Sequence, residues 1–148
     1  TTQLNRVGEA LAGIGGVRAM TDVTGFGLAG HLLEVCRGSG LSAVLRLAEL
    51  PLIEAARGLA QAGIATGASA RNWAAYGGEV HWPEGAADWQ RALLTDPQTS
   101  GGLLVSCSEA AVPAVLAAFR AAGFGEAAEI GHMQAHGAGE GSRLACVL

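Results

Sequence analysis

A polar, glycine-rich segment near the start of the chain holds the first residues that could do chemistry. Residues 21–31 read TDVTGFGLAGH and join a short apolar run to a helical pattern. The carboxylate of Asp22 suits a divalent cation that bridges protein and phosphate, because magnesium is commonly held by one or two carboxylates together with phosphate oxygens and water. Thr24 adds a hydroxyl beside it. Gly25 and Gly27 would let the backbone approach an anion at the positive end of the helix dipole.

Two other interpretations of this first loop stay open. Its glycines form G-x-G-x-x-G, the outline of a dinucleotide fingerprint, with Glu49 further along where an acidic ribose ligand would lie. Asp22 argues against it, because a carboxylate would stand where pyrophosphate charge must sit, and the preceding strand is short. The simplest alternative is that Asp22 and Thr24 only cap the helix that follows.

A second polar loop covers residues 95–102, TDPQTSGG, directly before an apolar run. Asp96 and the proline after it begin a turn, and Thr99 and Ser100 add hydroxyls. Gly101 and its neighbour Gly102 permit a positive φ or the close approach of another chain or ligand. The alternative is an ordinary turn closed by the aspartate side chain.

Several further residues are weaker candidates. Arg71 and Asn72 could line an anion-facing edge, or belong to a solvated turn. His132 and His136 are four residues apart but lie in a glycine-rich region without a third ligand, which argues against zinc. His31 is expected to be a hydrogen-bonded packing residue, and Ser100 lacks a G-x-S-x-G elbow. The tryptophans are expected to fill core or interface positions: Trp73, Trp82 and Trp89.

Composition excludes several classes of protein. The chain has 148 residues, half of them hydrophobic and 15% charged, which fits a single folded domain spanning residues 1–148. It contains no lysine, so a P-loop lysine, a Schiff-base lysine and a Ser-Lys dyad are all ruled out within it. With a net charge of −4 and no basic cluster, it is expected to bind no nucleic acid.

The cysteines and the apolar runs bear on location. Cys36, Cys107 and Cys146 are widely separated, which predicts buried thiols in a reducing compartment and hence a cytoplasmic protein. No secretory signal pattern is present, and the densest apolar stretch, residues 110–119, contains a proline and is too short to span a membrane. Because the chain opens on Thr1 and runs straight into helical periodicity, we expect a domain of a longer protein.

Periodicity and punctuation outline the elements that must position these loops. An amphipathic pattern capped by Thr2 predicts a first helix up to Ile14. Further helices are expected from Gly27, from Pro51 to about Gln61, over 86–94, and over 109–122 with Ser108 as its cap. Strands are expected at 17–20, 42–47, 103–107, 129–133 and 144–148, and the region 62–85 is expected to be irregular. This loose alternation predicts an α/β (α+β) sandwich, a mixed β-sheet with packed helices.

Three segments, in order, carry a family resemblance. Residues 19–32 contain TDVTGFGLAGH, residues 71–77 fit R-N-x-x-x-Y-G, and residues 96–104 read DPQTSGGLL. Together they resemble the selenophosphate synthetase (selenide, water dikinase) family. The resemblance covers essentially the whole chain but only the C-terminal half of such an enzyme, and it implies the fold of the C-terminal domain of aminoimidazole ribonucleotide synthetase-related proteins.

The resemblance also implies a function. These enzymes convert ATP, selenide and water into selenophosphate, AMP and phosphate with the help of Mg²⁺. Asp22 stands at the position of a magnesium ligand. The nucleotide or phosphate side would be lined by the following residues: Thr24, Gly25, Gly27, Arg71, Asn72, Asp96, Thr99, Ser100 and Gly101.

What this chain lacks follows from the same resemblance. The nucleophilic cysteine or selenocysteine, the essential lysine and the homodimer contacts belong to the N-terminal domain of the family. The 148-residue chain alone is therefore expected to be inactive. The alternatives are a related ATP-dependent kinase or synthetase, of the thiamine-monophosphate kinase or hydrogenase-maturation type, and a non-enzymatic dimerisation module that uses Trp73, Tyr76 and Trp82.

Overall fold

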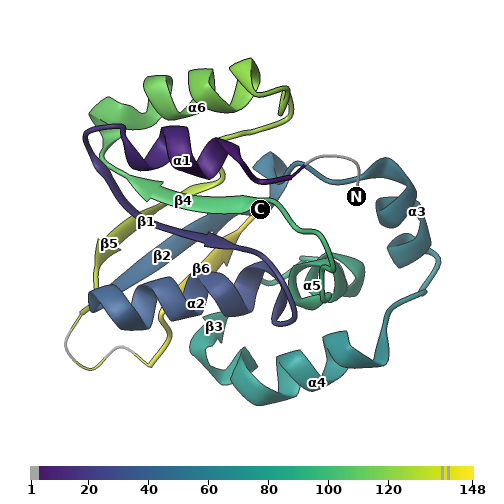
Figure 1. The fold of residues 1–148 in the computed structure, drawn as a ribbon. Coiled ribbons are helices and arrows are strands. Elements are labelled where there is room, and N and C mark those ends of the chain that lie inside the picture. The colour runs from purple at the N-terminus through teal and green to yellow at the C-terminus, as the bar shows by residue number, and fades with distance from the viewer. Residues whose placement is uncertain (1–3, 138, 140) are drawn as a thin grey trace.

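Helices and strands alternate along the chain, as the sequence predicts. The computed structural model describes residues 4–137, 139 and 141–148 (Figure 1). The helices are α1 (Val7–Ala12), α2 (Gly27–Ser39), α3 (Glu54–Gln61), α4 (Gly67–Tyr76), α5 (Asp88–Thr95) and α6 (Val112–Ala121). The strands are β1 (Val17–Asp22), β2 (Leu41–Arg46), β3 (Val80–His81), β4 (Leu103–Cys107), β5 (Gly131–Ala135) and β6 (Leu144–Val147). Three 3₁₀ turns complete the described elements: η1 (Leu47–Glu49), η2 (Gly77–Glu79) and η3 (Glu109–Ala111).

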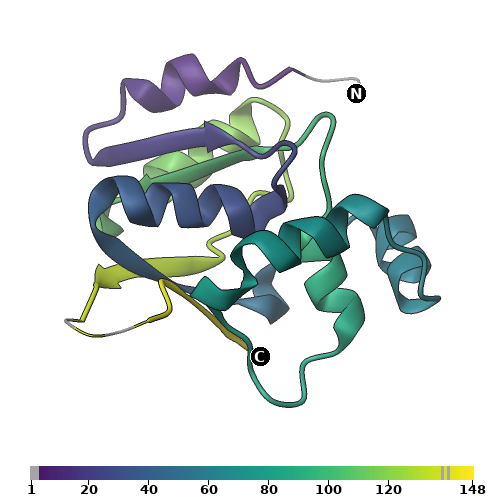
Figure 2. The same ribbon diagram turned by 90° about the horizontal axis from the view of Figure 1, so that it is seen from below.

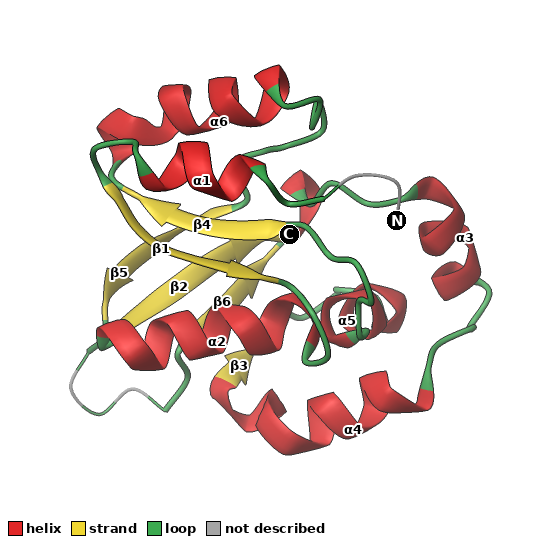
Figure 3. Cartoon of the chain, viewed as in Figure 1, coloured by secondary structure: helices red, strands yellow, loops and turns green. Residues whose placement is uncertain are grey.

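The strands form two sheets. β1 and β4 make an antiparallel pair, and the other four strands make a mixed sheet in the order β3-β6-β2-β5. Within the mixed sheet β2 runs antiparallel to β5 and parallel to β6. The predicted α/β (α+β) sandwich with a mixed sheet is confirmed, and the helices pack around both sheets (Figure 3).

The pairing of β1 with β4 brings the two polar loops together. Asp22, the last residue of β1, lies opposite Leu103, the first residue of β4. Because the strands are antiparallel, the loop that leaves β1 and the loop that enters β4 start at the same end of the pair. The two loops, which are far apart in the sequence, thus lie next to each other in the fold.

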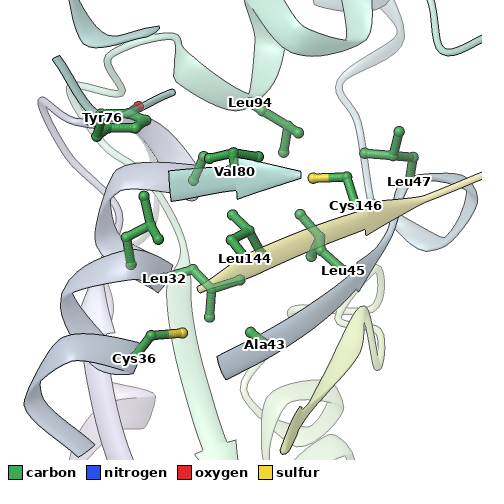
Figure 4. Close-up of a cluster of buried hydrophobic side chains, with 12 residues drawn as sticks. Leu32, Cys36, Ala43, Leu45, Leu47, Tyr76, Val80, Leu94, Leu144 and Cys146 are labelled. Atoms are coloured by element: carbon green, nitrogen blue, oxygen red, sulfur yellow. The ribbon is translucent and has the colours of Figure 1, made fainter. Parts of the chain in front are cut away.

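Two hydrophobic cores hold the elements in place. The smaller one joins α1 and α6 to β1 and β4, with Leu11 fully buried at its centre. The larger one gathers side chains of α2, α4, α5, β2, β3 and β6, including Leu45 and Leu144 (Figure 4). Cys36 and Cys146 also lie in this core, and burial raises the pKa of the Cys146 thiol to about 12. These two cysteines are small buried thiols, as predicted, and Cys107 is only partly buried.

The region 62–85, predicted to be irregular, contains a helix that sequence reasoning missed. α4 begins after Thr66, whose hydroxyl oxygen accepts a hydrogen bond from the Ser69 backbone N–H at 3.2 Å. This is an ordinary N-cap, and the alanine-rich run that follows favours helix. The glycines on both sides of that run led to the prediction of irregular structure, but they lie at the two ends of the helix.

Other boundaries also differ from the prediction. α3 begins at Glu54 and not at Pro51, because Ile53 before it is still extended. The Ser108 side chain makes no capping bond, and α6 starts after η3. β5 lies two residues later than predicted, at Gly131–Ala135. The predicted cap Thr2 lies outside the described residues.

The dinucleotide-binding interpretation is wrong. That fold needs a parallel strand-helix-strand unit in one sheet. Here β1 leads into α2 and then β2, but among the described strands β1 pairs only with β4, in a different sheet from β2. Among the described residues, no helix is long and apolar enough to cross a membrane.

Candidate functional site

The two polar loops are bonded to each other through their backbones. The Val23 N–H donates to the Gly102 carbonyl at 3.0 Å, and the Gln98 N–H donates to the Thr24 carbonyl at 3.0 Å. A Cβ built on Gly101 would overlap the Val23 carbonyl group. The close approach predicted for this glycine pair is therefore made by Gly101, and its partner is the first loop.

Asp22 lies exposed at the end of β1. In the part of the chain that the structure describes, its carboxylate has neither a hydrogen bond nor a salt bridge. The capping interpretation is not borne out, because α2 begins after Phe26 without any side-chain cap. The Asp22 carboxylate thus faces solvent, where a cation or another domain can reach it.

The hydroxyl of Thr24 contacts a histidine and not the helix start. His31 is buried on α2, with its Nε2 atom 3.0 Å from Thr24 Oγ1 and its Nδ1 atom 2.9 Å from a Glu34 carboxylate oxygen. His31 is thus a hydrogen-bonded packing residue, as predicted. Sequence reasoning missed Glu34, although a carboxylate three positions after a histidine on one helix is a usable signal.

The tip of the first loop is held by α4. Asn72 Nδ2 donates to the carbonyl oxygens of Gly25 and Thr95, both at 2.9 Å. The Tyr76 hydroxyl donates to the Phe26 carbonyl at 2.5 Å, and burial raises the pKa of this hydroxyl to about 12, so that it keeps its proton. Asn72 and Tyr76 therefore hold the backbone of the loop against α4, whereas the neighbouring Arg71 is exposed.

Gly27 allows α2 to start against the end of α5. Its φ is +67°, and a Cβ there would overlap backbone atoms of Leu94 and Thr95. Both reasons require glycine. This contact places the amino end of α2 next to the second loop.

Asp96 has a different environment from Asp22. One of its carboxylate oxygens accepts hydrogen bonds from the Thr66 hydroxyl at 2.7 Å and the Ser69 hydroxyl at 2.9 Å. Asp96 thus joins the second loop to the start of α4. Thr99 and Ser100, further along the loop, are exposed.

The remaining candidates lie elsewhere. His132 is on β5, and His136 Nδ1 lies 2.6 Å from the Ser42 hydroxyl, away from the two loops. No group of three His, Cys, Asp or Glu side chains within the described residues could hold a metal ion. Trp73 and Trp82 pack edge to face, with ring centroids 6.1 Å apart, on the larger core, as expected for core fillers.

The donor set at the two loops fits a shared magnesium site and not a complete one. Asp22 offers one carboxylate, and magnesium commonly uses one or two carboxylates together with phosphate and water. The described residues supply no cage around it. The chain can therefore contribute one side of a metal-phosphate site.

Comparison with known sequences places the chain in a family. The family described as "AIR synthase related protein, C-terminal domain" matches residues 1–142. The chain belongs to this family. It is similar to proteins named selenide, water dikinase, with 59% identity over 133 residues to that of Paraburkholderia xenovorans and 57% over 135 residues to that of Pseudomonas straminea. These matches cover 90% and 91% of this chain but only 38% of each relative.

A solved structure supports the same fold. The crystal structure of E. coli HypE, a hydrogenase maturation protein, aligns with a TM-score of 0.61 and 21% identity over 86% of this chain and 32% of that protein. At this identity the likeness shows the fold alone. The alignment therefore agrees with the mixed-sheet α/β fold described above for this AIR synthase related domain.

Proposed function

We propose that this AIR synthase related domain is the C-terminal part of a selenide, water dikinase, which makes selenophosphate from selenide, ATP and water. The observation that carries the proposal is the joining of the first and second loops beside an exposed, unpaired Asp22. Identities of up to 59% to proteins of that name support it. A hydrogenase-maturation function has weaker support, since that likeness is only 21% identical.

The residues would divide the work according to their surroundings. Asp22 would hold Mg²⁺ from this side, and the bound ion would neutralise charge on the polyphosphate oxygens of ATP. The exposed Thr99 and Ser100 of the second loop and the exposed Arg71 would face the nucleotide, while Gly101 would hold that loop against the first loop. Asn72 and Asp96 would keep both loops in place. Phosphoryl transfer depends mainly on such positioning and charge stabilisation.

The rest of the reaction would need parts that this chain lacks. The chain has no lysine, and it spans 38% of the length of the relatives that it matches. We propose that the nucleophile, the lysine, the other metal ligands and the homodimer contacts lie in a separate N-terminal domain. The free cysteines are consistent with action in the cytoplasm, where thiols stay reduced.

A chimaera tests this function. This chain would replace the matching region of the Paraburkholderia xenovorans enzyme, and AMP formation from ATP would be measured with selenide and Mg²⁺. We expect turnover, and we expect Asp22→Asn to lower it about tenfold or more, since a metal-binding carboxylate is lost. The matched control is Asp88→Asn, an exposed aspartate on α5 whose carboxylate pairs with Arg91.

Two results would count against the proposal. A folded chimaera without selenide-dependent AMP formation would contradict the assignment of the whole domain. Full turnover in the Asp22→Asn chimaera would remove the magnesium role of this residue, and the proposed function would then rest on the sequence identity and the family match alone.

A further inference from the structure

We propose that His31 is a positioning residue, which makes the Thr24 hydroxyl a hydrogen-bond acceptor for water on the bound cation instead of a donor to phosphate. The inference rests on the proposed function, since it concerns the same magnesium site. It moves Thr24 from the phosphate side, where the sequence resemblance places it, to the cation side.

The hydrogen bonds of His31 set the direction of each proton. An ionised carboxylate only accepts hydrogen bonds, so His31 Nδ1 must carry the hydrogen of its 2.9 Å bond to Glu34. In its neutral form, which is the form we propose for His31, an imidazole has only one N–H. His31 Nε2 is then an acceptor, and the Thr24 hydroxyl, 3.0 Å away, must donate to it.

The imidazole ring is held firmly enough to impose this choice. His31 is only 7% exposed, so water does not compete freely for its nitrogens. The imidazole packs beside the Phe26 ring, and the two ring centroids are 5.8 Å apart. The Phe26 carbonyl in turn accepts a hydrogen bond from the Tyr76 hydroxyl. The ring therefore cannot turn to offer Thr24 its other nitrogen without breaking the contact with Glu34.

The side chain of Thr24 is consequently left with acceptor capacity only. Its carbonyl oxygen already accepts from the N–H groups of Gln98 and Gly27. Its hydroxyl hydrogen is taken by His31, and two lone pairs of the hydroxyl oxygen remain. Phosphate oxygens need donors, whereas water molecules on Mg²⁺ need acceptors, and magnesium usually keeps several waters. Thr24 and the Asp22 carboxylate thus both match a hydrated cation.

A measurement on the 148-residue chain tests the proton arrangement directly. Both hydrophobic cores close within this chain, so it can be examined alone. Nitrogen-15 NMR of the histidine rings at about pH 8 would identify the His31 signals by their absence in His31→Gln. We expect a protonated Nδ1 and an unprotonated Nε2. An Nε2–H tautomer or a doubly protonated ring would overturn the proposal.

Kinetics of the chimaera test the consequence. We expect His31→Phe to raise the Mg²⁺ concentration for half-maximal turnover about tenfold, with the KM for ATP at saturating Mg²⁺ unchanged. Thr24→Val should reproduce the effect and Thr24→Ser should not. His31→Gln should restore much of the Mg²⁺ response, because its amide oxygen can accept the Thr24 hydrogen.

A milder variant covers the case in which His31→Phe does not fold. Glu34 is half exposed, and Glu34→Gln lets either tautomer form, so we expect a smaller shift of the Mg²⁺ response in the same direction. The matched control is Glu54→Gln on α3, where the carboxylate is largely exposed.

The outcomes separate this inference from the proposed function. If Asp22→Asn impairs turnover but the His31 and Glu34 variants leave the Mg²⁺ response unchanged, only the role of His31 fails. If the His31 variants change the KM for ATP instead, Thr24 belongs to the phosphate side and the inference is again wrong. If Asp22→Asn has no effect, the proposed magnesium site itself fails.

Discussion

Asp22 and Asp96 are the same residue type at the start of similar loops, yet their surroundings give them different tasks. Asp22 is exposed, and its carboxylate has no partner among the residues that the structure describes. Asp96 accepts two hydroxyl hydrogen bonds from the start of α4. A carboxylate without partners can bind a cation at little structural cost, whereas one oxygen of Asp96 is already engaged by two hydroxyl groups that hold the side chain against α4. The magnesium role is therefore proposed for Asp22.

The glycine pair in the second loop gives a matched test at single residues. Gly101→Ala would place a Cβ on the Val23 carbonyl group and within 2.8 Å of the Gln98 side chain. We expect it to lower the free energy of unfolding by about 1–3 kcal/mol, because the two loops must move apart. Urea denaturation measures this loss.

Gly102→Ala is the control for that experiment. A Cβ on Gly102 would meet nothing within 4 Å, and Gly102 does not have a positive φ. We expect a change below about 0.5 kcal/mol. Equal losses for both substitutions would show that the loop contact at Gly101 has no special importance.

At the scale of elements, α4 is the support on which both loops rest. Its first turn holds Asp96, and its later residues Asn72 and Tyr76 hold the first loop through backbone carbonyls. Tyr76 also belongs to the larger core, so the loop is connected to buried side chains (Figure 4). Figure 2 shows α4 close to the amino end of α2, which directly follows the first loop. The site thus depends on a helix that carries no expected metal ligand.

Removing the Asp96 carboxylate tests this support. Asp96→Ala leaves the buried Ser69 hydroxyl without its carboxylate partner, and we expect a loss of about 1–3 kcal/mol in the free energy of unfolding. Asp88→Ala removes an exposed carboxylate that pairs with Arg91 and should cost less than about 0.5 kcal/mol. If the two variants are equally stable, Asp96 does not join the loop to α4.

A surface ion pair between α2 and η2 gives a pH test. Arg37 and Glu79 meet at 2.5 Å, and the hydrogen bond from Arg37 lowers the pKa of the Glu79 carboxyl. A lowered folded-state pKa means that this contribution is present above the ordinary glutamate pKa and lost as the pH falls through the lowered value.

The expected effect of this pair is small, because both side chains are more than a third exposed. Arg37→Gln should reduce the free energy of unfolding by less than about 1 kcal/mol at pH 7. The difference from the unchanged chain should disappear in acid, once the pH has fallen below the lowered pKa of Glu79. Urea denaturation at both pH values measures it, and a difference that persists in acid would contradict the assignment to Glu79.

At the scale of the whole molecule, the two sheets enclose space but leave the candidate site open. A mostly apolar hollow of about 1300 Å³ lies among the sheets, α5 and α6, lined by residues such as Leu28, Leu93 and Leu116. Asp22, by contrast, lies on the surface. A metal-nucleotide complex bound there would touch this chain on one side only.

This openness predicts how the chain behaves alone. One carboxylate does not hold magnesium and a polyphosphate tightly, because magnesium gives up its water reluctantly. We expect the 148-residue chain to form no AMP from ATP, selenide and Mg²⁺, whereas the chimaera does. The same assay measures both. AMP formation by the chain alone at a rate near that of the chimaera would mean that the site is complete within these residues.

The sequence alone determined the fold class, most helices and strands, and the family, because these depend on local periodicity and on three motifs in order. Strand β4 is an example, since its short apolar run between polar loops predicts a strand. The glycine-rich region 62–85 was wrongly predicted to be irregular throughout, because the short alanine-rich helix α4 has little amphipathic pattern to detect.

Only the tertiary structure decided which polar residues meet. The antiparallel pairing of β1 with β4 places Asp22 beside the second loop, although about eighty positions separate them, and no local pattern encodes that pairing. The same packing assigns the Asp96 carboxylate to α4 and the Thr24 hydroxyl to His31. Residue type states what a side chain can bond, but burial and long-range neighbours select the bond that it makes.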